Sequence, residues 1–163
     1  MDGTAEETGL PPACADAVVA GTAFHWFDRA RTFPEIARIL RPPGVVGLLG
    51  NGFDISAQWV VRLREILGGS SLGRAGHWPS EEELLLYFDS VEQREFPHEQ
   101  TVNRDLLRDL ALSRSSVATL EAGEQEALLE RVAALWVHEP ELQGHDVARL
   151  GYLTRVRRCS GLH

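Results

Sequence analysis

The stretch from Asp16 to Asn51, DAVVAGTAFHWFDRARTFPEIARILRPPGVVGLLGN, contains two short apolar runs separated by a helical pattern. The first run, Asp16 to Ala23, is small and β-branched and follows the loop residues Pro11 and Pro12. The second run, Gly44 to Asn51, has the same character. Short and nearly continuous apolar runs are typical of strands covered on both faces, so each run predicts a buried strand.

Between the two runs, Asp28 is placed to cap a helix. The apolar positions that recur at helical spacing after it are Phe33, Ile36, Ala37, Ile39 and Leu40. The helix should end at Arg41-Pro42-Pro43-Gly44, because proline disfavours helical backbone in the residue before it. The Pro43-Gly44 pair suits the central positions of a type II turn. Strand, helix, turn and strand in this order predict a βαβ unit with two parallel strands.

Downstream of this unit the chain becomes more helical. Ser56 is placed to cap a helix from about residue 57 to 67, and a Gly/Ser-rich loop is expected from Gly68 to Gly76. Pro79-Ser80 precedes three glutamates, which favour the positive end of a short helix.

The last third predicts two strands around two helices. Val91 to Val102 alternates but contains Pro97, which predicts an edge strand because proline cannot donate to a ladder. Helices are expected at residues 103–112 and 116–137, the second broken near Gly123. Residues 146–158 alternate between apolar residues and arginines, so a half-exposed final strand is expected.

The composition excludes several classes of function. The chain has 163 residues, 16 basic and 24 acidic, so its formal net charge is −8, and every basic residue is arginine. This balance disfavours binding to nucleic acid or to a membrane surface, and the lack of lysine removes lysine chemistry. The N-terminus has no signal-peptide pattern and no apolar run is long enough to cross a membrane, so a cytoplasmic location is expected. The two cysteines, Cys14 and Cys159, are too few for a disulfide framework, and Cys14 is interpreted as an inert thiol.

Four segments, in this order, resemble class I S-adenosylmethionine-dependent methyltransferases, most closely the small-molecule branch that includes the trans-aconitate methyltransferases. Ser113-Arg114-Ser115-Ser116 and the arginine-rich final segment are also similar to that branch. The four segments are Gly3-Thr4-Ala5-Glu6, Asp16-Ala17-Val18-Val19, the run from Ala23 to Asp28, and Leu40-Arg41-Pro42-Pro43-Gly44.

The resemblance implies an α/β fold that is the C-terminal part of a Rossmann-like methyltransferase. The family sheet has the order 3-2-1-4-5-7-6, and this chain would supply strands 4, 5, 7 and 6 with their flanking helices, with strands 1–3 largely absent. The whole chain is then one incomplete domain, truncated at its N-terminus. Its parts are a Rossmann-like βαβ portion at residues 1–52, a helical insert at 53–90, and C-terminal strands and helices at 91–163.

The resemblance also implies the positions of the site residues. Thr4, Ala5 and Glu6 match the family's adenine loop, and Ala23 and Phe24 match the cofactor-binding end of the fourth strand. His25 would orient the substrate or act as the general base, because its unperturbed pKa lies near neutrality. Trp26 and Asn51 would face the substrate.

Each of these assignments has a simpler alternative. Residues 4–6 are equally compatible with an unstructured N-terminus. The aromatic run could pack against the following helix, with Trp26 in the core, and Asn51-Gly52 could be a plain turn. The arginines at positions 149, 155, 157 and 158 could face solvent along an edge or bind a carboxylate-bearing substrate. The six histidines form no close pair, so no metal site is expected.

The leading functional hypothesis is methyl transfer from S-adenosylmethionine to a small molecule. The sequence contains no GxGxG loop to hold the methionine part of the cofactor, so the chain alone is expected not to be competent. The alternative is a non-catalytic interaction protein or truncated remnant. Its first strand would pair, through an open edge, with a second copy or a separate chain.

Overall fold

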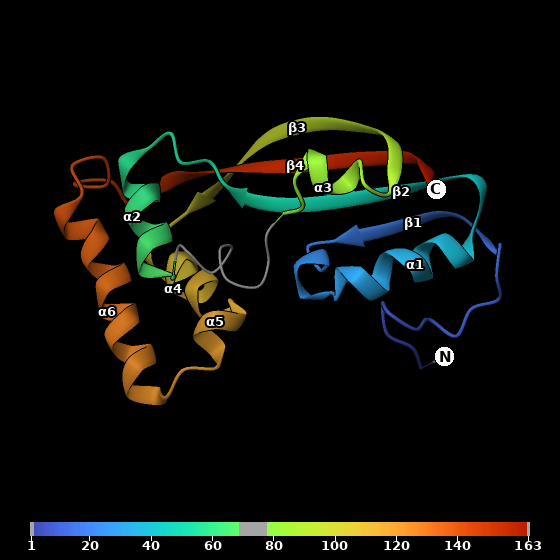
Figure 1. Ribbon diagram of the computed structural model, residues 1–163. Helices are drawn as coiled ribbons and strands as arrows, with labels where there is room; N and C mark the ends of the chain where they lie inside the picture. The colour runs from blue at the N-terminus through green and yellow to red at the C-terminus, as the bar shows by residue number, and fades with distance from the viewer. Residues whose placement is uncertain (1, 69–77, 163) are drawn as a thin grey trace. The chain divides into compact units, whose positions relative to one another are not determined.

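The computed structural model describes residues 2–68 and 78–162, and within them four strands form one sheet in the order β1-β2-β4-β3 (Figure 1). This order matches the predicted series 4-5-7-6, so the predicted fold class is confirmed. The predicted loop from Gly68 to Gly76 lies, apart from Gly68, outside the described residues. The strands are β1 (Ala15–Gly21), β2 (Leu40–Phe53), β3 (Phe88–Val102) and β4 (Ala148–Leu162).

The pairing confirms the parallel βαβ unit. β1 runs parallel to β2, with Ala17 opposite Val45 and Gly21 opposite Leu49. β4 runs against its two neighbours, as the arrows in Figure 1 show. Its contacts move backward along β4 as they move forward along β3, from Ser160–Ser90 to Arg155–Glu95.

The turn predicted at Pro43-Gly44 is wrong. β2 already begins at Leu40, which pairs with Ala15, and the next paired residues are Ala17 and Val45. Residues 41–44 are therefore an irregularity within the ladder, and Gly44 lacks the positive φ that a type II turn requires. Strand pairing on both sides of the segment outweighs its turn propensity.

Chain contacts divide the protein into two compact units. Unit 1 contains the described residues of 1–51, 72–96 and 154–163, and unit 2 contains those of 52–71 and 97–153. The predicted boundaries at residues 52 and 90 stay a prediction.

Unit 1 is organised around helix α1 (Arg29–Ile39). The side chain of Asp28 accepts a hydrogen bond from the N–H of Ala30 at 3.1 Å, which confirms the predicted cap. The short helix predicted after Pro79-Ser80 is α3 (Glu81–Leu84), and the side chain of Ser80 caps it. The core of the unit is formed by Ala20, Phe24, Phe33, Ile36, Leu40, Val46, Leu48, Leu84, Phe88 and Cys159.

β1 is buried on one face only, so the prediction of a strand covered on both faces is wrong. Ala20 is buried in the core of unit 1, whereas Val19 on the opposite face is 65% exposed. The reason is that β1 ends the described sheet and the core of unit 1 covers only one of its faces.

Unit 2 is mainly helical. Its helices are α2 (Gln58–Ile66), α4 (Arg104–Leu112), α5 (Ser115–Ala118) and α6 (Ala122–His138). Its core includes Trp59, Leu63, Leu107, Leu135 and Trp136.

Three details of unit 2 test the predicted helix ends. Asn103 caps α4, with its side-chain oxygen accepting from Leu106 N–H at 2.8 Å. Ser56 does not cap α2: Ala57 holds the cap position, and the carboxylate of Glu141 accepts from the N–H of Trp59. The break between α5 and α6 precedes Gly123, which lies in the first turn of α6.

In the described residues, β1 and β3 are the two edge strands of the sheet. The position of β3 at the edge confirms the prediction made from Pro97.

No helix in the described residues is long and apolar enough to span a membrane.

Candidate functional site

The candidate site lies in unit 1, where the chain leaves β1. Thr22 follows the strand in the left-handed region, at φ 49°, and its N–H donates to the carbonyl oxygen of Leu49 at 2.8 Å. Half-buried Ala23 then caps the short 3-10 helix η1 (Phe24–Trp26), and its carbonyl accepts from the N–H of Trp26. The backbone therefore turns sharply at the carboxyl end of a parallel strand, where ligands bind in open α/β sheets.

Phe24 anchors this turn in the core. Its ring is 2% exposed and lies 5.7 Å from the ring of Phe27 and 5.6 Å from that of Phe33. The next two side chains are more exposed than this anchor: His25 is half-buried, Trp26 is 68% exposed, and their ring centroids are 5.0 Å apart. The alternative that the aromatic run packs against the following helix holds for Phe24, which contacts Phe33 of α1. The interpretation of Trp26 as a core residue is wrong.

The N-terminal loop is tied to the same place. Glu6 accepts a hydrogen bond from the backbone N–H of Asp28 at 2.9 Å, so its carboxylate sits at the start of α1. This hydrogen bond, with others from its own N–H and from the side chain of Thr4, lowers the pKa of Glu6. Glu6 is therefore an anion at neutral pH.

Residues 4–7 form a hydrogen-bonded turn, so the alternative of an unstructured N-terminus is wrong for this segment. Thr4 N–H donates to the carbonyl of Glu7 at 2.9 Å, and the hydroxyl of Thr4 accepts from Glu7 N–H at 3.1 Å. Ala5, inside the turn, is half-buried. The loop and η1 together bring the predicted cofactor residues to the start of α1.

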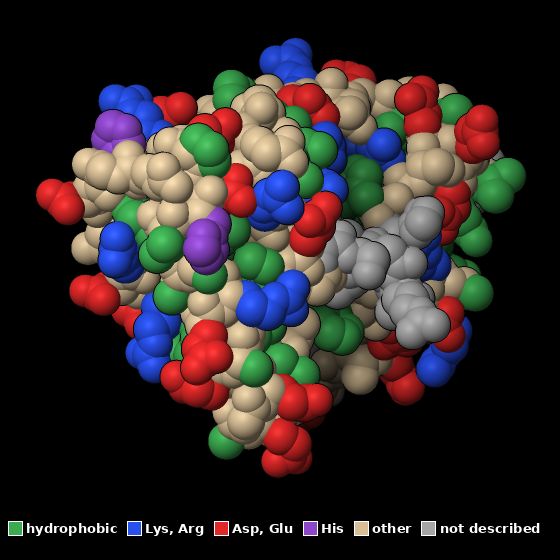
Figure 2. Space-filling view, turned by 90° about the vertical axis from the view of Figure 1, so that its left-hand side faces the viewer, with side chains coloured by type: hydrophobic (Ala, Val, Ile, Leu, Met, Phe, Trp, Pro, Cys, Tyr) green, Lys and Arg blue, Asp and Glu red, His purple; other side chains and the backbone are tan. Residues whose placement is uncertain are grey.

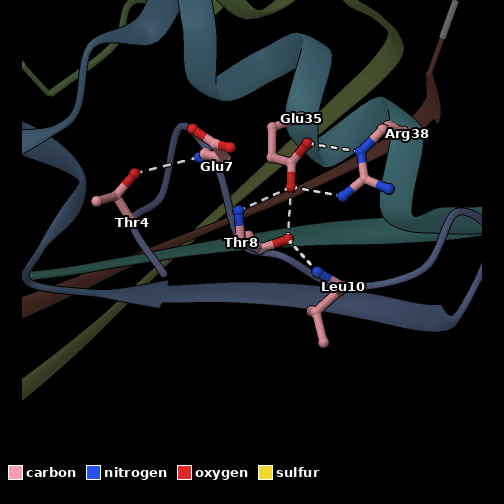
Figure 3. Close-up of polar contacts among 6 residues, drawn as sticks. All are labelled: Thr4, Glu7, Thr8, Leu10, Glu35 and Arg38. Carbon is pink, nitrogen blue, oxygen red and sulfur yellow. Dashed lines mark hydrogen bonds and ion pairs between the residues drawn. The ribbon is translucent and has the colours of Figure 1, made fainter. Parts of the chain in front are cut away.

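A second attachment fixes the loop to α1 (Figure 3). The backbone N–H and the hydroxyl of Thr8 both donate to Glu35 Oε1, at 2.9 and 2.5 Å, and Arg38 binds the same carboxylate through two nitrogens at 2.7 Å. The guanidinium of Arg38, followed by the two donors of Thr8, lowers the pKa of Glu35 to about 2.

This contact predicts how acid acts on the loop. The pKa of Glu35 is lowered by folding, so the attachment is complete above the ordinary carboxyl pKa of 4.5 and is lost as pH falls towards about 2. We expect the amide resonance of Thr8 to titrate with a midpoint near 2, and Glu35→Gln to abolish that titration. A midpoint near 4.5 would show that the carboxylate is not held by Arg38 and Thr8.

Asn51 was predicted at the end of its strand, and this placement is wrong. β2 continues to Phe53, and the side-chain oxygen of Asn51 accepts a hydrogen bond from the hydroxyl of Thr154 at 3.1 Å. Asn51-Gly52 is therefore not a turn, because pairing with β4 keeps this segment extended. Asn51 remains exposed and lies two residues beyond Leu49, the partner of Gly21 in the ladder.

The sequence did not indicate the pair between Arg29 and Glu83. Two carboxylate oxygens of Glu83 accept from Arg29 Nη1 at 2.6 and 2.7 Å, and the guanidinium lies 5.7 Å from the ring centroid of Phe24. The pair joins α3 to the first residue of α1. Its two members are 54 residues apart, so no spacing rule could have found it, although the Glu35–Arg38 pair has a recognisable helical spacing.

The arginines of β4 have partners on β3. Arg149 pairs with Glu99 at 2.8 Å, Arg155 with Glu95 at 2.6 Å, Arg158 with Glu92 at 2.9 Å, and Arg157 donates to Gln93 at 2.7 Å. The edge interpretation fits these contacts, because the three carboxylates neutralise Arg149, Arg155 and Arg158, and the amide of Gln93 occupies Arg157.

The two cysteines are free thiols, one exposed and one buried. Cys14 is an exposed free thiol, and burial raises the pKa of the Cys159 thiol to about 11. Among residues 2–68 and 78–162, no three His, Cys, Asp or Glu side chains are arranged to hold a metal ion.

The strand order β1-β2-β4-β3 is that of the C-terminal part of a Rossmann-like methyltransferase fold. A methyltransferase domain family matches residues 1–48. Two solved structures are also similar: a candidate type II methyltransferase from Anaeromyxobacter dehalogenans and a candidate methyltransferase from an antibiotic biosynthesis pathway of Anabaena variabilis. The first is 25% identical with a TM-score of 0.60, and the match covers 97% of this chain and 68% of the Anaeromyxobacter chain. The second is 25% identical with a TM-score of 0.57, covering 98% and 72%.

Curated relatives are consistent with these structures. An uncharacterized methyltransferase of Mycobacterium tuberculosis is 36% identical over 160 residues, which are 97% of this chain and 63% of the relative. An uncharacterized methyltransferase of Schizosaccharomyces pombe is 27% identical over 154 residues, which are 93% of this chain and 61% of the relative. The chain thus spans less than two thirds of these relatives. These matches show that the chain is similar to methyltransferases over nearly its whole length.

Proposed function

We propose that the carboxyl end of β1 is the adenosine side of an S-adenosylmethionine site, in a protein that methylates a small molecule. The observation that carries this proposal is the attachment of Glu6 to the N–H of Asp28, directly after His25 and Trp26. That attachment places the matched adenine loop, Thr4 to Glu6, beside the matched end of the strand. A cytoplasmic location remains a prediction.

The side chains present fit such a ligand. The anionic carboxylate of Glu6 suits the positive charge of the sulfonium, whose sulfur is bonded to the adenosine part of the ligand. The exposed indole of Trp26 offers a flat face to a purine. Ala5 and Ala23, both half-buried, leave room for the ligand to approach the backbone.

The proposed chemistry needs little from the protein beyond alignment and one proton acceptor. S-adenosylmethionine supplies a methyl group already activated on a sulfonium, so the acceptor atom forms a bond to carbon as the carbon–sulfur bond breaks. In the described chain the imidazole of His25 has no hydrogen-bond partner, so a ring nitrogen is free to take the acceptor's proton. The side-chain oxygen of Asn51 binds Thr154, and its amide nitrogen has no acceptor among the described residues, so we assign that nitrogen to orienting the methyl acceptor.

We expect the chain alone to bind the methyl donor weakly. Its sequence lacks the glycine-rich loop that holds the methionine part, so only the adenosine side is supplied. Isothermal titration of the purified chain with S-adenosylmethionine should give a dissociation constant in the millimolar range, about 4 kcal/mol of binding free energy. A micromolar dissociation constant would contradict the expectation that the chain alone binds the methyl donor weakly. The same titration of Trp26→Ala reports whether binding occurs at the proposed site.

A second candidate function is strand-mediated association. β1 ends the described sheet, its Val19 is 65% exposed, and Asp16 is the one charged residue in it. The other edge, β3, carries Pro97 and many charges, which discourage pairing. If β1 pairs with a second copy or another strand, light scattering on the purified chain should show a dimer that Val19→Lys dissociates. A monomer at all concentrations would count against it.

A further inference from the structure

Unit 2 contains a groove between α2 and α6, separate from the residues assigned to methyl transfer. Its volume is about 300 Å³, and its apolar lining comes from Ile66 on α2 and from Ala134 and Leu135 on α6. Leu135 is 4% exposed, so it forms a fixed part of the lining. This volume is at the small end of ligand-binding cavities and suits a molecule of amino-acid size.

One wall of the groove is held by an ion pair. Arg62 Nε lies 2.8 Å from Glu139 Oε1, and the carboxylate side chain is only 11% exposed. Glu139 also ends α6, where its N–H donates to the carbonyl of Leu135 at 2.9 Å. The ion pair engages both the nearly buried carboxylate of Glu139 and the guanidinium of Arg62, and the backbone bond fixes the residue that carries the carboxylate, so we do not assign either charge to a ligand.

Two further charges of opposite sign line the same groove without a partner. Glu65 projects from α2 and Arg131 from α6, and in the described part of the chain neither side chain makes an ion pair or hydrogen bond. They do not pair with each other either. The groove therefore presents a carboxylate and a guanidinium on its two helices, with apolar surface from Ile66, Ala134 and Leu135.

Figure 2 shows the side of the molecule on which α6 lies in Figure 1. Acidic, basic and histidine side chains are interspersed over this face, so no single sign of charge dominates it. A purely anionic or purely cationic ligand would gain little from such a surface. A ligand with both charges would satisfy both free groups.

We propose that this groove binds an α-amino acid with an apolar side chain. Its carboxylate would pair with the guanidinium of Arg131, its ammonium with the carboxylate of Glu65, and its side chain would cover Ile66, Ala134 and Leu135. Charge-assisted hydrogen bonds of this kind are the strong ones, and an arginine fork matches a carboxylate. The site is independent of the proposed methyl transfer.

The test uses L-leucine as the probe and the isotopically labelled full chain. We expect saturable changes in the amide resonances around Glu65 and Arg131, with a dissociation constant of about 1 mM. Arg131→Gln and Glu65→Gln should each weaken binding about 10-fold, because each removes one charge-assisted contact. Arg108→Gln, at an exposed arginine of α4, is the matched control and should bind as the native chain does.

Two analogues separate the charges. 4-Methylpentanoate lacks the ammonium and isopentylamine lacks the carboxylate, so each should bind about 10-fold more weakly than leucine. Absence of saturable shifts at about 50 mM leucine would overturn the proposal, since such a site would have no useful affinity. Equal binding of leucine by Arg131→Gln, Glu65→Gln and the native chain would overturn it as well.

Discussion

Replacement of Phe33 by alanine is expected to lower the free energy of unfolding by about 3–5 kcal/mol, a large part of the stability of a domain of this size. Phe33 is 1% exposed and lies at the centre of the aromatic core of unit 1. Its ring centroid is 5.6 Å from Phe24, 4.2 Å from Tyr87 and 5.8 Å from Phe88. The substitution would leave a cavity between α1 and the segment that follows α3.

Urea unfolding followed by circular dichroism measures this effect. Phe33→Leu keeps most of the volume and should cost less than about half as much. Arg31→Ala, at an exposed position on the same helix, should change stability by less than about 0.5 kcal/mol. A loss below about 1 kcal/mol for Phe33→Ala would mean that this ring is not packed as described.

Trp136 should be as important for unit 2. The side chain is 2% exposed in the second core, and its indole N–H donates to the carbonyl of His145 at 2.6 Å. Trp136→Ala removes both the packing and the donor, so we expect a loss of about 3–5 kcal/mol in the free energy of unfolding.

The packing and the hydrogen bond can be separated by a second variant. Trp136→Phe retains an aromatic ring but leaves the carbonyl of His145 without its donor, at a cost of about 1–3 kcal/mol. Val137→Ala, whose side chain is 56% exposed on the next position of α6, serves as the control. Equal stability of Trp136→Phe and the native chain would show that the carbonyl of His145 accepts a hydrogen bond from water in the variant.

The sequence was sufficient for features that depend on local chemistry. Asp28 caps its helix as predicted, and Ser80 and Asn103 cap the helices predicted to begin near them, because a side-chain oxygen at the cap position satisfies a backbone donor whatever the rest of the fold does. The strand order came from the resemblance, and Pro97 independently placed β3 at an edge.

Features that depend on distant partners could not be predicted. Ser56 lost the cap of α2 to a carboxylate on Glu141, far along the chain. The predicted turn at Pro43-Gly44 became part of a strand because of its pairing with β1. The prediction that β1 is covered on both faces was wrong, because an apolar run does not reveal whether other elements of the fold cover one face of the strand or both.

The same distinction applies to the candidate site. Adjacent residues such as His25 and Trp26 could be grouped from sequence, since one short helix presents both. The attachment of Glu6 to Asp28 joins residues 22 positions apart, and that of Thr8 to Glu35 joins residues 27 apart. Only the folded backbone brings these groups together.

The central claim, that the carboxyl end of β1 forms the adenosine side of a methyl-donor site, is tested most directly by nuclear magnetic resonance. The labelled chain would be titrated with S-adenosylhomocysteine, and the amides of Ala5, Glu6, His25, Trp26 and Asp28 followed. We expect saturable shifts at these five positions with a millimolar dissociation constant, reduced in Trp26→Ala. Saturable shifts elsewhere with none at these residues, or no shifts at about 10 mM ligand, would contradict the claim.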